Sequence, residues 1–147
     1  MQGKGVRIVV RGEPFGKGRP KLGVVAGHAH AFTPAKTRTK EGIITTAATD
    51  AMNGRPPFSA PLCFSLVAVM AVPQSWSQKR KRAALAGEEL PAKRPDLDNC
   101  LKAVLDAMNT VVFTDDALIV EIRARKVYGQ VPQTIVEVWP DEGRAAQ

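Results

Sequence analysis

The sequence predicts a small mixed α+β domain, of the broad α/β class, in which helices pack on a mixed sheet of about four strands. Three segments carry this prediction: a continuous apolar run over residues 62–72, a helical apolar stripe over 98–109 and an alternating run over 117–127. A chain of 147 residues fits one domain and can bury a substantial core. We therefore expect a single domain over the whole chain, with frayed ends at 1–5 and 141–147.

The first predicted element is a strand over residues 6–10, because a run rich in β-branched residues ends where turn residues begin. A basic loop follows, and its side chains Lys17, Arg19 and Lys21 are candidate contacts to DNA phosphates. Glycines in this loop would let the backbone approach a partner closely. A solvated flexible turn is the alternative interpretation of the same residues.

Threonine and proline at positions 33 and 34 predict the start of a helix over residues 35–52. The run over 62–72 is apolar throughout rather than alternating, which is typical of a central strand covered on both faces. Ser75 is predicted to cap a short charged helix that Gly87 closes. The four successive basic residues of that helix either contact DNA or form a solvated face.

The clearest helix is predicted over residues 98–109, where apolar residues recur at helical spacing and are expected to pack on the sheet. This stripe consists of Leu97, Leu101, Val104, Leu105 and Met108. Asp98 and Lys102 lie four residues apart, so their side chains project from the same, more polar face. Taken alone, the two residues fit an ordinary ion pair, with Asp96 or Asp98 as the helix cap.

Two further acids, Asp115 and Asp116, stand before a strand that is predicted over residues 117–127. Alternation assigns one face of this strand to Leu118, Val120, Ile122 and Ala124, and the other face to Ile119, Glu121, Arg123 and Arg125. Adjacent residues of an extended chain point in opposite directions, so we expect only one of the two acids to join a shared site. A last strand over 134–139 closes the predicted sheet.

The acidic cluster lies in a strongly basic chain, with 21 Lys and Arg against 14 Asp and Glu and a net charge of +7. Such a balance favours a polyanionic partner, although it also serves solubility alone. Magnesium is usually held by one or two carboxylates together with substrate phosphate. The sequence therefore predicts a metal centre that acts on a phosphodiester backbone.

Cys63 and Cys100 lie far apart in apolar runs, which argues against a zinc site or a disulfide framework and favours a reducing cytosol. The first residues contain no apolar stretch of the signal-peptide kind, and the longest apolar run is too short to cross a bilayer. We therefore expect a cytoplasmic protein with no membrane attachment.

Two long segments, RPDLDNCLKAVLDAMN and VVFTDDALIVEIRARKVYG, resemble the RusA family of Holliday junction resolvases, which are crossover junction endodeoxyribonucleases of bacteria and their phages. The segments GEPFGKGRPK and AFTPAKTR agree with this family, so the resemblance extends over residues 6–139. The specific part is the pattern D-x-D-N-x-x-K with a later D-D, and every one of these positions is present.

The resemblance implies that Asp96, Asp98 and Asp116 bind Mg²⁺, for which Mn²⁺ can substitute, and that Lys102 is the family's essential lysine. Asp115 is the alternative to Asp116, because the turn before this pair varies in length among relatives. The family also implies a homodimer whose paired active sites nick two opposed strands of a four-way junction symmetrically. One or two ions are compatible with the residues.

In the expected mechanism the ion activates a water molecule for attack on phosphorus, and Lys102 neutralises the scissile phosphate or the leaving oxygen. Two other functions use the same residues. In one, the protein binds junctions without cutting them, and its acids merely cap a helix. In the other, it is a general metal-dependent nuclease with a different substrate, such as RNA.

Overall fold

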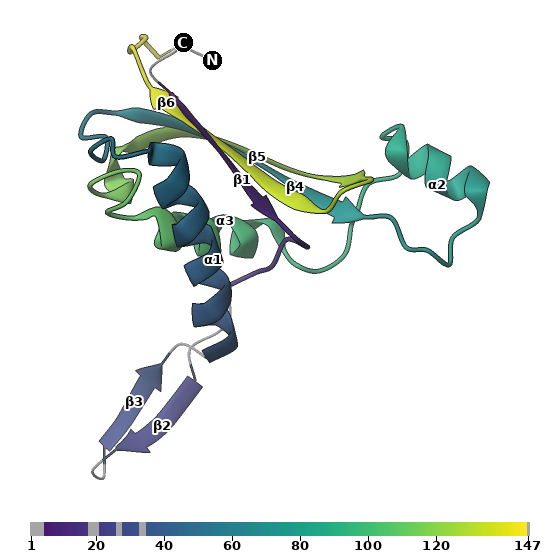
Figure 1. The fold of residues 1–147 in the computed structure, drawn as a ribbon, viewed down its shortest axis with the longest axis horizontal. Coiled ribbons are helices and arrows are strands. Elements are labelled where there is room, and N and C mark those ends of the chain that lie inside the picture. The colour runs from purple at the N-terminus through teal and green to yellow at the C-terminus, as the bar shows by residue number, and fades with distance from the viewer. Residues whose placement is uncertain (1–4, 18–20, 26–27, 33–34, 147) are drawn as a thin grey trace.

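Helices α1 and α3 cover one face of a four-stranded sheet in the computed structural model of the protein (Figure 1). The structure describes residues 5–17, 21–25, 28–32 and 35–146, and within 21–38 it describes only the course of the backbone. The strands are β1 (Val6–Arg11), β2 (Lys21–Val25), β3 (His28–Phe32), β4 (Leu62–Ala71), β5 (Ile119–Gly129) and β6 (Gln133–Pro140). The helices are α1 (Ala35–Met52), α2 (Gln78–Leu85) and α3 (Leu97–Met108), with a short 3₁₀ turn at Asp116–Leu118.

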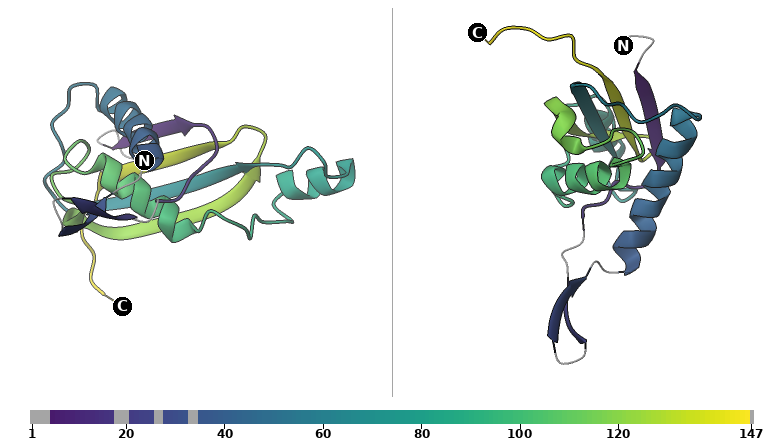
Figure 2. Two further views of the ribbon diagram at one scale, coloured as in Figure 1. Left: turned by 90° about the horizontal axis from the view of Figure 1, so that it is seen from below. Right: turned by 90° about the vertical axis from the view of Figure 1, so that its left-hand side faces the viewer.

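The sheet has the strand order β1-β6-β4-β5. Strand β6 runs antiparallel to both β1 and β4, whereas β4 and β5 are parallel. The predicted fold class, a mixed sheet of about four strands with helices packed on it, is confirmed. Strands β2 and β3 form a separate antiparallel hairpin that extends away from the sheet (Figures 1 and 2), and no sequence pattern used above predicts it.

Most predicted elements are found within two residues of their predicted ends. Helix α1 has the predicted bounds, and it ends where Asn53 and Gly54 adopt positive φ angles of 50° and 80°. Its predicted N-terminal residues, 33 and 34, lie outside the described residues. The charged helix α2 is capped by Ser77 rather than by Ser75, because the Ser77 side chain accepts a hydrogen bond from the backbone N–H of Arg80.

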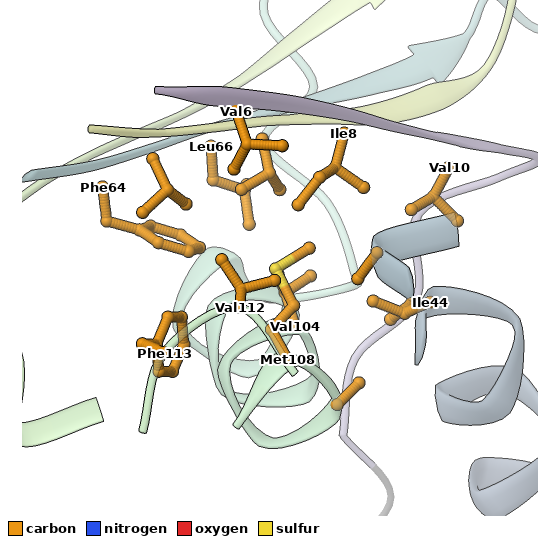
Figure 3. Close-up of a cluster of buried hydrophobic side chains, with 14 of the residues drawn as sticks. Val6, Ile8, Val10, Ile44, Phe64, Leu66, Val104, Met108, Val112 and Phe113 are labelled. Carbon is orange, nitrogen blue, oxygen red and sulfur yellow. The ribbon is translucent and has the colours of Figure 1, made fainter. Parts of the chain in front are cut away.

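The core fills the space between the sheet and the two long helices (Figure 3). Its members come from β1 (Val6, Ile8 and Val10), β4 (Phe64 and Leu66), α1 (Ile44), α3 (Val104 and Met108) and the following turn (Val112 and Phe113). The two helices are also joined directly, because the Thr45 hydroxyl donates a hydrogen bond to the carbonyl oxygen of Ala107 over 2.9 Å. This contact fixes the position of α3, which carries most of the candidate site residues.

Strand β4 is central, as predicted, but the helices cover only one of its faces. On the other face Ser65 and Val67 are only partly buried. A cavity of about 500 Å³ lies on that face, with Cys63, Glu121 and Asp141 in its lining. The prediction of a strand covered on both faces is therefore wrong, and the apolar run over 62–72 reflects the central position of β4 in the sheet.

Strand β5 begins later than predicted, after the 3₁₀ turn, and an irregularity near its start changes which side chains face the core. Ile119 pairs with Leu62 and packs against the core, whereas Val120 is 62% exposed. The predicted faces of these two residues are therefore wrong. Beyond the irregularity Ala124 packs against the core, as predicted. Ile122 remains 43% exposed, because β5 is an edge strand.

Residues 141–146 form no helix or strand, yet two contacts tie their beginning to the sheet. The backbone N–H of Asp141 donates to the carbonyl oxygen of Pro61, and the Cys63 thiol donates to the Asp141 carboxylate over 3.0 Å. Burial, reinforced by this carboxylate, raises the pKa of Cys63 to about 11. Both cysteines are free and buried. Over the described residues, no helix has the length and apolar character that crossing a membrane requires.

Candidate active site

Helix α3 separates an apolar face from a charged one. Its buried residues are Cys100, Ala103, Val104, Ala107 and Met108, while the predicted stripe members Leu97, Leu101 and Leu105 are partly buried at the edge of the core. Asp98, Lys102 and Asp106 follow one another at four-residue steps and lie on the side of the helix away from this core. The left panel of Figure 2 views the molecule from below, with α1 and α3 in front of the sheet.

Asp96 occupies the N-cap position of α3, but its side chain does not cap the helix. Such a side chain normally accepts a hydrogen bond from a backbone N–H in the first turn. Here Asp96 makes no side-chain capping bond, and among the residues that the structure describes Asp98 accepts a hydrogen bond only from the N–H of its neighbour Asn99, over 3.0 Å. Neither carboxylate is in an ion pair with another described residue. The two carboxylates at the start of α3 are therefore available to a ligand.

Asp106, one helical step beyond Lys102, is held by two lysines. Lys17 Nζ lies 2.9 Å from one of its oxygens and Lys102 Nζ lies 3.2 Å from the other. Burial alone would raise the pKa of Asp106, but the hydrogen bonds from Lys17 and Lys102 outweigh it and lower that pKa. The expected pair of Lys102 with Asp98 is thus replaced by a pair with Asp106, and this exposed contact contributes little energy.

Lys17 comes from the loop after β1 and also lies 2.7 Å from Glu41 of α1. Burial alone would lower the pKa of Lys17, but its hydrogen bonds to Glu41 and Asp106 raise it. Lys17 therefore links α1 to α3 through its ion pairs with Glu41 and Asp106. Its predicted contact to DNA phosphate stays a prediction.

The loop that carries Lys17 packs against the start of α3. The backbone N–H of Lys17 donates to the Asn99 carbonyl, and a Cβ atom on Gly16 would stand 3.0 Å from the Asn99 Cβ. Gly16 therefore allows its loop to lie close to α3 of the same chain, whereas the sequence predicted a close approach to a partner. Of the other predicted DNA contacts, Arg19 and the side chain of Lys21 lie outside the described residues.

Asp115 and Asp116 lie before β5, and their carboxyl groups are in hydrogen-bond contact with each other. The backbone N–H of Ala117 donates to Asp115 over 3.0 Å, and this bond, followed by a hydrogen bond with Asp116, lowers the pKa of Asp115. The same carboxyl contact is the main cause of the raised pKa of Asp116, and burial and the charges of Asp115 and Asp106 add to it. The positive charge of Lys102 lowers the pKa of Asp116, so Lys102 lies within electrostatic reach of this carboxyl group.

The predicted site residues therefore fall into two groups along one side of α3. Asp116 lies near Lys102 and Asp106, toward the end of the helix. Asp96 and Asp98 lie at its beginning, and the eight residue steps from Asp98 to Asp106 span about 12 Å of helix axis. In the part of the chain that the structure describes, no three His, Cys, Asp or Glu side chains are grouped so that they could hold a metal ion.

The donor chemistry nevertheless fits a hard divalent cation. All the candidate ligands are carboxylate oxygens, and Mg²⁺ characteristically keeps several waters and uses only one or two carboxylates besides substrate phosphates. Asp96 with Asp98, and Asp115 with Asp116, each supply two such groups. A bound phosphodiester would supply the remaining oxygens.

Sequence reasoning did not identify two residues that position the site. Lys126 of β5 donates hydrogen bonds to the carbonyl oxygens of Lys93, over 2.6 Å, and Pro95, over 3.0 Å, and so holds the segment that leads into Asp96. The sequence did contain an indication of this role, because Lys126 lies two residues after Ala124 and therefore on the core-facing side of the strand, where a lysine is unusual. Glu41 gave no such signal, because its contact with Lys17 joins residues 24 positions apart.

Comparison with known proteins gives two similarities that cover the candidate site. A family model described as endodeoxyribonuclease RusA matches residues 11–139, which is most of the chain. The uncharacterized protein YqaN of Bacillus subtilis strain 168 is 28% identical over 137 residues, covering 90% of this chain and 94% of that protein. The matched family range includes Asp96, Asp98, Lys102, Asp115 and Asp116.

Proposed function

Because the chain belongs to the RusA family of endodeoxyribonucleases, we propose that it resolves Holliday junctions by paired symmetrical nicks, as a Mg²⁺-dependent homodimer in DNA recombination and repair. The observation that carries this proposal is the state of the acids on α3. Asp96 occupies a capping position without capping, and Asp98 has no cationic partner among the described side chains. Both carboxylates are exposed and have no cationic partner among the described residues, so they are free to bind a cation.

In this proposal Asp96 and Asp98 would hold Mg²⁺ at the start of α3, and Asp116 would hold it as a separate group near Lys102, in each case together with oxygens of the bound phosphodiester. When bound, the ion supplies Lewis-acid stabilisation of the charge that develops on the phosphate. The chain's own residues prepare the site for it. Asp115 accepts the N–H of Ala117 and thereby fixes the turn that presents Asp116.

Lys102 is the proposed cationic catalytic residue. Its side chain is 64% exposed and lies beside Asp106 and within electrostatic reach of Asp116. An ammonium group on a flexible stem suits the neutralisation of a phosphate oxygen during cleavage, where a movable point charge is needed. Its exposed ion pair with Asp106 costs little to exchange for a phosphate. The Lys17 contact then keeps Asp106 in place.

The proposed function is tested by mixing the protein with a labelled four-way junction, a linear duplex of the same sequence and an RNA hairpin, each with Mg²⁺ or with EDTA. We expect paired nicks at symmetrical positions in the junction, only with Mg²⁺. Junction binding without nicks in Mg²⁺ would instead identify a non-cleaving binding protein. Cleavage of the linear duplex or of the RNA at a similar rate would identify a general nuclease.

A further inference from the structure

Helix α2 lies at one end of the molecule, beyond the sheet, on the connection between β4 and α3 (Figures 1 and 2). A helix of eight residues is too short to be stable alone. This one has a defined cap at each end. Ser77 caps its N-terminus, and at its C-terminus Gly87, with φ of 82°, donates to Ala84 while Glu88 donates to Ala83. This pair of backbone bonds is a Schellman motif.

Apolar and aromatic contacts anchor α2 to the end of β5. Ala84 is buried in a small cluster with Met70 and Tyr128. The rings of Trp76 and Tyr128 pack edge to face with their centroids 5.4 Å apart. The helix therefore has a fixed orientation on the domain.

Among the four successive cations of α2, Arg80 differs in its contacts from Lys79 and Arg82. Arg80 is used within the fold, because its guanidinium lies 3.5 Å from the centroid of the Trp76 ring and makes hydrogen bonds of 2.9 and 2.8 Å to the two oxygens of Glu89. Lys79 and Arg82 are exposed and have no ion pair with another described residue. They are three residues apart and share a helical face, whereas Arg80 and the buried Ala84 share another.

The segment around α2 is basic as a whole. Residues 78–94 contain six Lys or Arg and two Glu, and one of these glutamates, Glu89, is the partner of Arg80. The same segment leads directly into Asp96, and Lys126 holds its last residues in place. A positive helix that is anchored on β5 thus precedes, along the chain, the helix that carries the candidate catalytic carboxylates, and it lies at the end of the molecule beyond the sheet (Figure 1).

We propose that the exposed face of α2, formed by Lys79 and Arg82, binds the phosphate backbone of a double-stranded DNA arm beside the site of cleavage. This inference rests on the proposed function, because it assumes that a branched DNA is the substrate. Two uncompensated cations on a fixed helix complement the charge of a duplex backbone, and contacts of this kind position DNA without reading its sequence. Arg80 is excluded from this role by its contacts with Trp76 and Glu89.

The test measures binding of the four-way junction in EDTA by fluorescence anisotropy between about 50 and 200 mM KCl, where salt weakens phosphate contacts strongly. For Lys79→Gln/Arg82→Gln we expect weaker binding and a slope of log K against log salt that is smaller by about 1 to 2. The charge-conserving variant Lys79→Arg/Arg82→Lys should retain the parental slope. Arg7→Gln/Arg125→Gln removes the same charge from exposed positions on other elements and should also retain it.

A parental slope in Lys79→Gln/Arg82→Gln would overturn the proposal, as would an equal loss in Arg7→Gln/Arg125→Gln. The junction-cleavage assay distinguishes this failure from failure of the proposed function. Paired nicking by the parent together with an unchanged slope would refute only the role of α2. A parent that binds neither junction nor duplex would refute both.

Discussion

Asp98 is the residue whose substitution best separates a structural role at the start of α3 from a role as a metal ligand. Its carboxylate has no cationic partner among the described residues and accepts only the N–H of Asn99. We expect Asp98→Asn to bind four-way junctions at least as well as the parent, because a negative charge near phosphate is removed. Cleavage in Mg²⁺ should fall by about 100-fold or more, since a metal ligand can contribute several kcal/mol to the reaction.

The matched control for this variant is Asp50→Asn, which makes the same isosteric change at an exposed position of α1. It should cut junctions at the parental rate. Single-turnover cleavage and anisotropy binding on the same junction separate catalysis from affinity. Equal cutting by Asp98→Asn and the parent would remove Asp98 from the catalytic centre.

Lys17 is the residue whose role in stability has a definite pH range. The folded pKa of Asp106 lies below its ordinary value of 3.8, so its stabilising contribution is present above about pH 4 and is lost as the pH falls further. The folded pKa of Lys17 lies above 10.5, so its contribution is lost as the pH rises past that value. Between these limits we expect Lys17→Met to lower the free energy of unfolding by about 1–3 kcal/mol.

Urea unfolding at pH 3, 7 and 11 measures this difference directly. The gap between Lys17→Met and the parent should be largest at pH 7 and should narrow at both extremes. Lys79→Met, which removes an exposed and unpaired lysine, should stay within about 0.5 kcal/mol of the parent at pH 7. A gap that does not change with pH would argue that Lys17 acts through packing of its aliphatic stem.

At the scale of elements, the contact between α1 and α3 depends on Thr45. Its single hydroxyl proton is shared between two backbone carbonyl oxygens, that of Glu41 in its own helix, at 3.0 Å, and that of Ala107 in α3, at 2.9 Å. Thr45→Val keeps the shape of the side chain but leaves the Ala107 carbonyl without this partner, so we expect a loss of about 1 kcal/mol in urea unfolding. The control is Thr46→Val, because Thr46 is exposed and, among the described residues, its hydroxyl donates only to the Gly42 carbonyl of the same helix. Equal effects of the two variants would contradict a special role for the link between the helices.

Element positions were predictable where turn or capping residues mark the end of a run, as they do at the end of β1 and at the ends of α1. The register of β5 was not predictable, because the irregularity opposite Leu62 and Cys63 depends on pairing with a strand more than fifty residues away. Local alternation therefore misplaced Ile119 and Val120. The predicted N-cap of α2, Ser75, was wrong by two residues. Two serines lie within three positions, and the sequence pattern did not distinguish which of them caps the helix.

At the scale of the whole molecule, the sequence located the acids but not their surroundings. Spacing on one helix predicted that Asp98 and Lys102 share a face, and the resemblance to the RusA family added Asp96, while the catalytic roles of all three stay predictions. The ion pairs of Lys17 with Glu41 and Asp106 could not, because they join the loop after β1, α1 and α3 across long stretches of chain. Hydrophobic periodicity carries no information on which distant charges meet. The separation of Asp98 from Asp116 along α3 likewise required the three-dimensional arrangement.

The proposed homodimer predicts how mixed dimers of parent and variant cut a junction, which the activity of a single variant cannot show. If each subunit nicks one of two opposed strands, a dimer of one parental and one Asp98→Asn subunit should nick only one strand of a junction. After the two proteins are mixed equally and allowed to exchange subunits, about one quarter of the dimers are fully parental under random pairing. We expect paired cuts to fall to about that fraction while single nicks accumulate.

A plasmid that extrudes a cruciform measures this outcome, because paired cuts linearise the plasmid and single nicks give open circles. Asp50→Asn mixed with the parent in the same way should leave the yield of linear product unchanged. Sedimentation of the parent alone gives the subunit number independently. If linear product fell only to one half, in direct proportion to the parental protein, each cutting unit would contain one active chain, and the model of two cooperating subunits would be wrong.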